Sequence, residues 1–234
     1  MTNVTSKRCS RCYHPRMRLI EQLVEEHERI DRTLGAFRTW AGELAEGRAP
    51  REDGTRFIAF FELYAGRFHH EREEEVLFTT LASKAEVPRE RGPIAVLTAD
   101  HRDLESRLAK LRSLLPIETS KSTETLRDLV YAYTEALWTH IDAENSVLFP
   151  ESESRLRRNG VRELDGRAPS VEELALAADA EALAVRYPPG EDAGVIRGEG
   201  CVMCAAYGDR CAGIEREWWG ENEWDEFDEH IGAS

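Results

Sequence analysis

Four stretches of the chain each carry a stripe of apolar residues at a spacing of three and four, and a histidine lies within every stripe. The stripes span residues 20–44, 58–76, 94–115 and 126–147. The histidines within them are His27, His69, His101 and His140. A spacing of three and four keeps one face of an α-helix apolar and is typical of a helix packed in a bundle. The pattern therefore predicts four amphipathic helices, each with a histidine on its apolar face.

Short connections separate the predicted helices. Residues that favour turns interrupt the pattern at 47–54, 87–93 and 116–122, and we expect Pro150 to end the fourth helix. Long helices joined by short loops pack as antiparallel neighbours. We therefore predict an all-α fold, an up-down-up-down four-helix bundle, over residues 16–151.

The chain on either side of the bundle has a different composition. An arm over residues 1–15 contains a Cys-x-x-Cys pair, and an extension over residues 152–234 contains a second pair and an acidic, aromatic tail. Within the extension, Ser170 is followed three residues later by Glu173, which is a capping-box pattern. This pattern predicts an additional helix from Val171 to Tyr187. We expect three parts: the arm, the bundle and the extension.

The sequence His-x-x-x-Glu occurs twice, as His69 with Glu73 and as His140 with Glu144. Residues four apart share a face of a helix, so each pair points an imidazole and a carboxylate the same way. A lone histidine on an apolar face is usually an ordinary core residue. Two unpaired carboxylates, however, would each cost several kcal/mol to bury, and bound metal removes that cost. Because the pattern repeats in both halves of the bundle, it predicts two equivalent metals.

This arrangement resembles the hemerythrin-like, or HHE cation-binding, domain. The resemblance covers about residues 16–151 and rests on the H…HxxxE…H…HxxxE pattern, on Glu26 before His27, and on two Leu-Phe pairs with Pro150. It implies a non-haem centre of two iron ions, of the Fe–O–Fe type, inside the bundle. By the same resemblance, the imidazole ligands are His27, His69, His101 and His140, and the carboxylates that bridge the irons are Glu73 and Glu144.

The chain departs from the oxygen-carrying members of that family at one position. Those proteins have a fifth histidine one turn after the third-helix histidine, where this chain has Glu105. His70 is a candidate additional ligand because it directly follows a predicted ligand; Glu74 and Glu105 are alternatives, and otherwise His70 points to solvent. Exchanging a histidine for a carboxylate makes the iron pair more electron-rich, which favours activation of dioxygen or peroxide over reversible carriage.

The five cysteines lie only near the two ends of the chain. They are Cys9, Cys12, Cys201, Cys204 and Cys211. Four thiolates bind zinc or a single iron in a tetrahedron, and the two Cys-x-x-Cys pairs would form one such structural site if the extension returns to the end of the bundle where the arm begins. Alternatively, the pairs form reversible disulfides with Cys211 as the resolving thiol, or all are free thiols.

The charge and hydropathy of the chain limit its partners. A net charge of −14 repels a phosphate backbone, so we expect no nucleic-acid partner. No apolar run approaches the ~20 residues of a membrane span, and the first residues contain no apolar run of the kind found in signal peptides. We therefore expect a cytoplasmic protein with no membrane partner.

Two functions are consistent with these patterns. The first is a di-iron oxidoreductase that activates dioxygen or peroxide, with an organic substrate that the sequence does not identify. The second is a sensor or binding protein whose di-iron site reports oxygen, nitric oxide or iron through the C-terminal extension. Turnover favours the first, and ligand-dependent exposure of the tail without turnover favours the second. Storage is disfavoured by the missing fifth histidine and the long tail.

Overall fold

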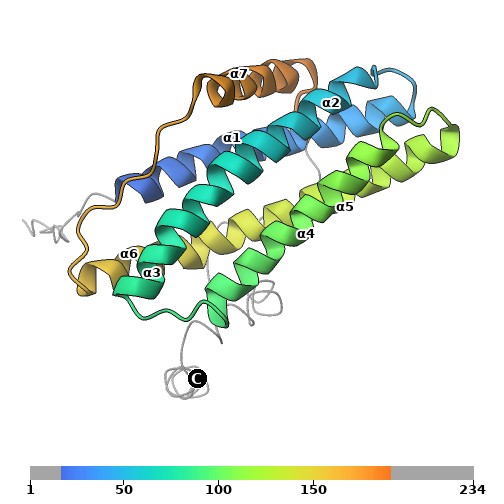
Figure 1. Cartoon of the computed structure of the whole chain (residues 1–234). Coiled ribbons are helices and arrows are strands. Elements are labelled where there is room, and N and C mark those ends of the chain that lie inside the picture. The colour runs from blue at the N-terminus through green and yellow to red at the C-terminus, as the bar shows by residue number, and fades with distance from the viewer. Residues whose placement is uncertain (1–16, 191–234) are drawn as a thin grey trace, which may run out of the picture.

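The computed structural model of the chain describes residues 17–190, and all regular secondary structure in that range is helical (Figure 1). This confirms the predicted all-α class. The arm over residues 1–15, the acidic tail and the cysteines lie outside the described residues. The cysteines concerned are Cys9, Cys12, Cys201, Cys204 and Cys211.

Four long helical runs form the bundle, and two of them contain π-helical segments. The first run is α1 (Arg18–Ala45) and the third is α4 (Gly92–Leu114). The second is built from α2 (Glu52–Ala59), η1 (Phe60–His70), η2 (Glu73–Phe78) and α3 (Thr79–Lys84). The fourth is built from α5 (Ser120–Ala143), η3 (Glu144–Leu148) and α6 (Phe149–Arg158). Each run contains one of the four predicted apolar stripes.

The prediction that Pro150 ends the fourth helix is wrong. The helical run continues through α6 to Arg158, and Pro150 lies in the first turn of α6. Proline is tolerated in the first turn of a helix, where its missing N–H has no intrahelical acceptor. The wide turns of η3 just before it create such a start inside the longer run.

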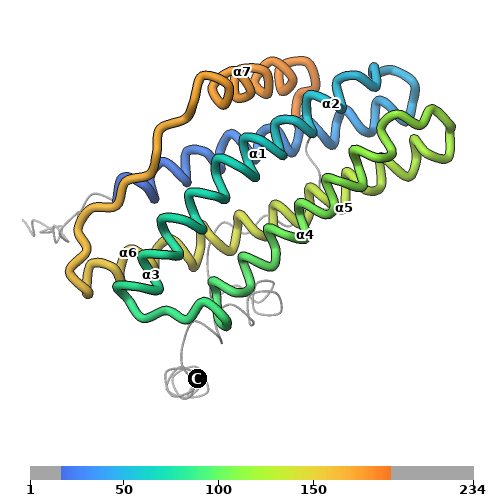
Figure 2. Tube along the Cα trace, in the orientation of Figure 1, coloured from blue at the N-terminus to red at the C-terminus, as the bar shows by residue number. Residues whose placement is uncertain are grey.

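Neighbouring helices run antiparallel along the bundle, as the tube in Figure 2 shows. Between α1 and the fourth run, His27 contacts Asn145 of η3 while Arg38 contacts Thr134 of α5, so residue numbers rise along one run as they fall along the other. Near one end of the bundle, the backbone N–H of Met17 donates to Glu153.

The α5 helix begins at a capping box in which Thr119 and Ser122 bond each other's backbone N–H groups, which satisfies donors at the helix start.

The buried side chains form two apolar layers with a polar layer between them. One apolar layer, towards the loop between α1 and α2, includes Phe37, Trp40, Phe57, Phe61 and Tyr133. The other, towards the opposite end, includes Leu23, Leu77, Phe78, Leu148 and Phe149. The histidines of the four stripes fall between these two layers on every helical run. The fold therefore places the charged and imidazole groups at one level, enclosed by hydrocarbon on both sides.

The additional helix α7 (Val171–Arg186) is present as predicted, and Ser170 and Glu173 form the capping box. It packs against α1, α2 and η1 (Figure 1) through a strip of small and apolar residues that includes Ala177, Ala180 and Leu183. The Tyr187 hydroxyl at its end donates to the buried Asp53 at 2.6 Å. Within residues 17–190, no helix is long and apolar enough to cross a membrane.

Candidate metal centre

The π-helical segments carry four of the polar residues in the central layer. His69 and His70 lie at the end of η1, while Glu73 and Glu144 begin η2 and η3. Successive side chains on an α-helix point about 100° apart, because 3.6 residues complete each turn. Here both neighbouring histidines are buried, with 1% of His69 and 7% of His70 exposed. Single π turns often occur at functional sites, and these turns bring adjacent residues into the same interior.

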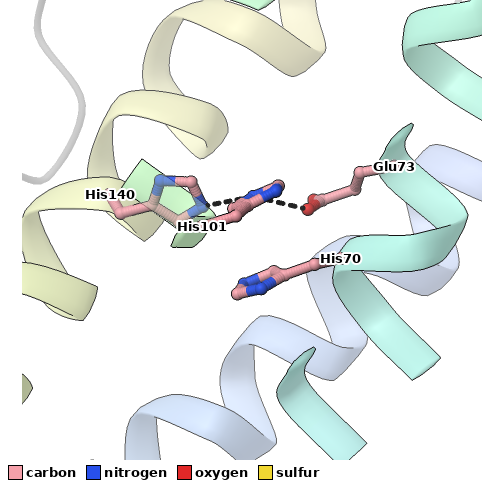
Figure 3. A group of neighbouring side chains, drawn as sticks. All are labelled: His70, Glu73, His101 and His140. Atoms are coloured by element: carbon pink, nitrogen blue, oxygen red, sulfur yellow. Dashed lines mark hydrogen bonds and ion pairs between the residues drawn. The ribbon is translucent and has the colours of Figure 1, made fainter. Parts of the chain in front are cut away.

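The side chains of this layer form two groups that share Glu73. One group consists of His27, His69, Glu73 and Glu144. The other consists of His70, Glu73, His101 and His140 (Figure 3). In each group, one nitrogen or oxygen from every residue lies within 4.8 Å of the others, and all of the residues are buried. Each group is therefore close enough to hold one metal ion, and the shared carboxylate joins the two groups.

The Nε2 atoms of the histidines converge on the two carboxylates. His27 Nε2 lies 2.9 Å from His69 Nε2, and His101 Nε2 lies 3.1 Å from His140 Nε2. Glu144 Oε2 lies 3.3 Å from Nε2 of both His27 and His140. Glu73 likewise approaches Nε2 of His69 at 3.3 Å and Nε2 of His101 at 3.5 Å. Both carboxylates therefore face imidazoles from both halves of the bundle.

The outer nitrogen, Nδ1, of each of these histidines faces an acceptor oxygen. Three pairs are hydrogen-bonded: His27 with Asn145 at 2.9 Å, His69 with Glu26 at 2.9 Å, and His101 with Glu74 at 2.7 Å. Nδ1 of His140 lies 3.5 Å from Asp100 without a hydrogen bond. An acceptor at Nδ1 places the proton there and leaves the Nε2 lone pair free to bind a metal. The hydrogen bonds therefore orient His27, His69 and His101 for coordination through Nε2, and the carboxylate of Asp100 faces the corresponding nitrogen of His140.

The acceptor role of these residues was not predicted from the sequence, in which Glu26 entered only through the family resemblance and Glu74 only as an alternative ligand. Each of the four is a direct neighbour of a residue in the centre. Glu26 precedes His27, Asp100 precedes His101, Glu74 follows Glu73, and Asn145 follows Glu144. Each one supports a histidine on a different helical run from its own, so helix packing decides the pairings. The sequence signal for these acceptors was a polar residue directly beside a candidate ligand.

Arg72 reinforces the support of His69. Its guanidinium, 3% exposed, donates to the second oxygen of Glu26 and, at 2.6 Å, to Gln22. A buried carboxylate is stabilised by such a charge-assisted pair. Glu26 is thus held between His69 and Arg72, which fixes the orientation of the His69 ring.

The two Leu-Phe pairs place an aromatic ring beside the centre from each half. Phe149 stacks on His27 with ring centroids 5.3 Å apart, and Phe78 lies parallel to His101 at 6.2 Å. These rings belong to the apolar layer that closes one side of the polar layer. They fill space beside the imidazoles and limit the access of water from that end.

His70 is held differently from the other histidines. Its ring stacks on His101 with centroids 3.9 Å apart and an interplanar angle of 8°, as Figure 3 shows. It is buried and belongs to the second group, so it does not point to solvent. Of the two alternatives, Glu74 bonds the outer nitrogen of His101, and Glu105 is exposed and lies in neither group. Of the three candidates for the additional ligand, the structure therefore brings His70 into the second group and neither Glu74 nor Glu105.

The electrostatics of the two carboxylates differ because of their surroundings. Burial and the nearby charge of Glu144 raise the pKa of Glu73 well above its usual value. Burial also acts to raise the pKa of Glu144, but His140 and His27 outweigh it and lower that pKa. Burial holds the pKa values of His69 and His70 well below the ordinary value. Neutral imidazoles are the form that binds metal.

The carboxylate oxygens show that the residues fit bound cations. None of the four oxygens of Glu73 and Glu144 receives a hydrogen bond from any part of the chain that the structure describes. A buried carboxylate without donors is costly, and metal ions at the two groups would satisfy these oxygens. Imidazole nitrogen with carboxylate oxygen suits iron, manganese and zinc.

The fold and the centre together define a helical-bundle protein with a buried site for metal cations. Comparison with known families agrees: residues 18–152 match the model of the hemerythrin HHE cation binding domain. The match covers more than half of the chain, and the chain therefore belongs to this family. No curated protein and no solved structure matches the chain.

Proposed function

We propose that the two groups hold a pair of iron ions. The imidazole ligands are His27 and His69 in one group and His70, His101 and His140 in the other. Glu73 and Glu144 would supply carboxylate oxygens to both ions. The observation that carries this proposal is the sharing of Glu73 between two buried groups whose carboxylate oxygens have no hydrogen-bond donors.

The proposed activity is that of an oxidoreductase acting on dioxygen or peroxide. Bound iron would supply the electrons for such chemistry. The chain contributes by enclosing the polar layer between two apolar layers and by leaving His70 and His101 in contact with a pocket. A centre that small molecules can reach is suited to reaction rather than to a purely structural role.

The test combines metal content with turnover. Protein expressed with iron and purified without chelator should contain about two irons per chain in the bundle, and should consume hydrogen peroxide or dioxygen at a rate that follows iron occupancy. The variant His101→Ala should lose both iron and turnover. Exposed Glu105 supplies the matched control, since Glu105→Gln should retain both. An iron-loaded protein without turnover would contradict the oxidoreductase proposal while leaving the metal site intact.

A second candidate function is a sensor, and one observation favours it. The helix α7 packs directly on η1, the segment that carries His69 and His70. Arg167, just before α7, lies over the ring of Phe68 with 4.7 Å between its guanidinium carbon and the ring centroid. A ligand-dependent change in η1 would therefore reach the C-terminal extension. Hydrogen exchange of α7 that responds to nitric oxide or dioxygen, in protein without turnover, would support this function.

A further inference from the structure

A pocket of about 280 Å³ reaches the centre from the side, between η1 and α4. Its buried wall includes His70 and His101 from the second group and Tyr133 from α5. Its exposed rim includes Arg67 and Glu105. The first group of the centre contributes no residue to this wall, so the pocket serves one half of the centre.

Gly66 keeps this pocket open. It lies inside η1, where glycine costs about 1 kcal/mol relative to alanine, and its φ is not positive. A Cβ at this position would meet only the carbonyl oxygen of Phe61, at 3.4 Å. Neither the backbone conformation nor crowding therefore requires glycine here. What glycine provides is the empty volume beside His70 that a side chain would fill.

Tyr133 is the one residue of α5 that lines this pocket. The side chain is 1% exposed and its ring packs edge-on against Phe61 with centroids 5.4 Å apart. A buried tyrosine hydroxyl usually has a hydrogen-bond partner, but within residues 17–190 the Tyr133 hydroxyl has none. Burial raises the pKa of Tyr133, so the group stays a neutral donor that is available to a ligand.

The size and lining of the pocket indicate the class of ligand. A water-sized molecule occupies about 30 Å³, so the volume is roughly an order of magnitude more than dioxygen or peroxide needs. The remaining wall is apolar, with Phe61, Leu104 and Leu108. At the rim, Glu62 pairs with Arg112, and Arg67 is balanced by Glu105. The inner wall thus combines apolar side chains with the polar groups of His70, His101 and Tyr133, while the charges at the rim cancel. A mixed wall without net charge suits a small neutral organic molecule that has an apolar body and one polar group.

We propose that this pocket binds a small, mainly apolar organic molecule with one hydroxyl or carbonyl group, seated beside His70 and His101 and hydrogen-bonded to Tyr133. The ligand's role as a substrate of the centre rests on the proposed function, whereas its binding rests on the pocket alone. Phenol matches this description in size and polarity and serves as the probe.

The test measures phenol binding to the metal-loaded full chain by nuclear magnetic resonance. Saturation transfer to phenol on zinc-loaded protein reports binding, and extra relaxation of phenol protons on anaerobic ferrous protein, relative to the zinc form, reports proximity to the metals. Wild-type protein should give both signals. Binding should weaken at least tenfold in Gly66→Leu, which fills the pocket, and several-fold in Tyr133→Phe, which removes the hydroxyl.

A matched control variant and a second pocket-filling variant complete the test. Gly42 also lies inside a helix and a Cβ there would meet one atom at 3.4 Å, but it does not line this pocket, so Gly42→Leu should leave phenol binding unchanged. If Gly66→Leu fails to fold by circular dichroism, Ala109→Trp at the exposed rim fills the pocket from α4 instead.

The outcomes separate this proposal from the proposed function. Absence of phenol signals on protein that holds its metals would overturn the pocket proposal and leave the metal centre standing. Equal binding by wild type and a folded pocket-filling variant would overturn it as well. Phenol binding that depends on Gly66 and Tyr133, in protein that retains no iron, would support the pocket and contradict the proposed function.

Discussion

Glu73 and His69 lie one helical turn apart, yet the carboxylate of Glu73 does not serve His69 alone. Its Oε1 lies 3.3 Å from His69 Nε2, and its Oε2 lies 3.5 Å from Nε2 of His101 on another helix. The shared position of this one side chain couples the two groups of the centre.

Replacing Glu73 by glutamine should weaken metal binding and stabilise the metal-free protein. The buried charge and its repulsion with Glu144 raise the pKa of Glu73. Below the unfolded pKa of ~4.5 this carboxyl group is protonated in both the folded and the unfolded chain, and its burial costs no charge. As the pH rises towards the folded pKa, the unfolded chain releases the proton more readily, so the folded state loses stability relative to the unfolded state. The gain in metal-free Glu73→Gln should therefore be larger at pH 8 than at pH 5. Thermal unfolding at both pH values measures it, and an equal gain at both would contradict the assignment.

Replacing Asn145 by alanine should weaken metal binding about 10–100-fold without removing a ligand. The Asn145 side chain faces Nδ1 of His27 at 2.9 Å and holds that ring in place. Competition with a chelator of known affinity measures the change. Glu25→Gln on α1 is the control, since Glu25 is exposed, and it should bind metal as the wild type does.

Acidification below about pH 6.5 should destabilise the metal-free protein through His70. Burial lowers the pKa of His70 well below its ordinary value. At mildly acidic pH the unfolded chain therefore binds a proton at His70 that the folded chain does not bind. A group of this kind costs stability as pH falls from its unfolded pKa towards its folded pKa. The variant His70→Asn should therefore lose less stability between pH 7 and pH 5 than the wild type in urea titrations. A greater loss of stability in the variant than in the wild type would contradict this role of His70.

Replacing Tyr187 by phenylalanine should destabilise the docked extension by about 1–2 kcal/mol. The Tyr187 hydroxyl donates to Asp53, which is 4% exposed and also pairs with Arg56 and Arg186. Hydrogen bonds to charged groups contribute about 1.5–3 kcal/mol, and the two arginines retain part of that support. Urea unfolding measures the loss. Tyr131→Phe, on the partly exposed Tyr131 of α5, supplies the comparison and should change stability less.

The four cysteines of the two Cys-x-x-Cys pairs remain predicted to bind one zinc or iron. One contact at the end of the bundle agrees with this prediction: the backbone N–H of Met17 donates to Glu153, which places the start of α1 beside α6. If the site forms, Cys201→Ser should remove one metal per chain and leave the iron of the bundle unchanged. Unchanged total metal in this variant would instead favour the disulfide or free-thiol alternatives.

The helices and the inner residues of the centre were readable from the sequence because both depend on periodicity. An apolar stripe with one histidine specifies which face is buried, and His-x-x-x-Glu specifies a shared direction. The second stripe was the least regular, since charged groups occupied core positions. That irregularity coincides with η1 and η2, the segments in which the turn widens.

Other features depended on contacts between helices and could not be read from one stripe at a time. The inward position of His70 follows from the π turns of η1, which no apolar period of three and four predicts. Glu26 supports His69 across two helices, and Arg72 supports Glu26 in turn. The continuation of the fourth run beyond Pro150 depends on η3, whose wide turns make the proline the start of a new α-helical segment.

The most direct test of the shared centre is the iron content of full-length protein in which the four paired cysteines are replaced by serine. Elemental mass spectrometry should find about two irons per chain in this variant. When Glu73→Gln is added, the binding of both irons should be lost or weakened together, because Glu73 belongs to both groups. No transition metal after anaerobic ferrous reconstitution, or loss of only one iron on changing Glu73, would contradict a centre built around this carboxylate.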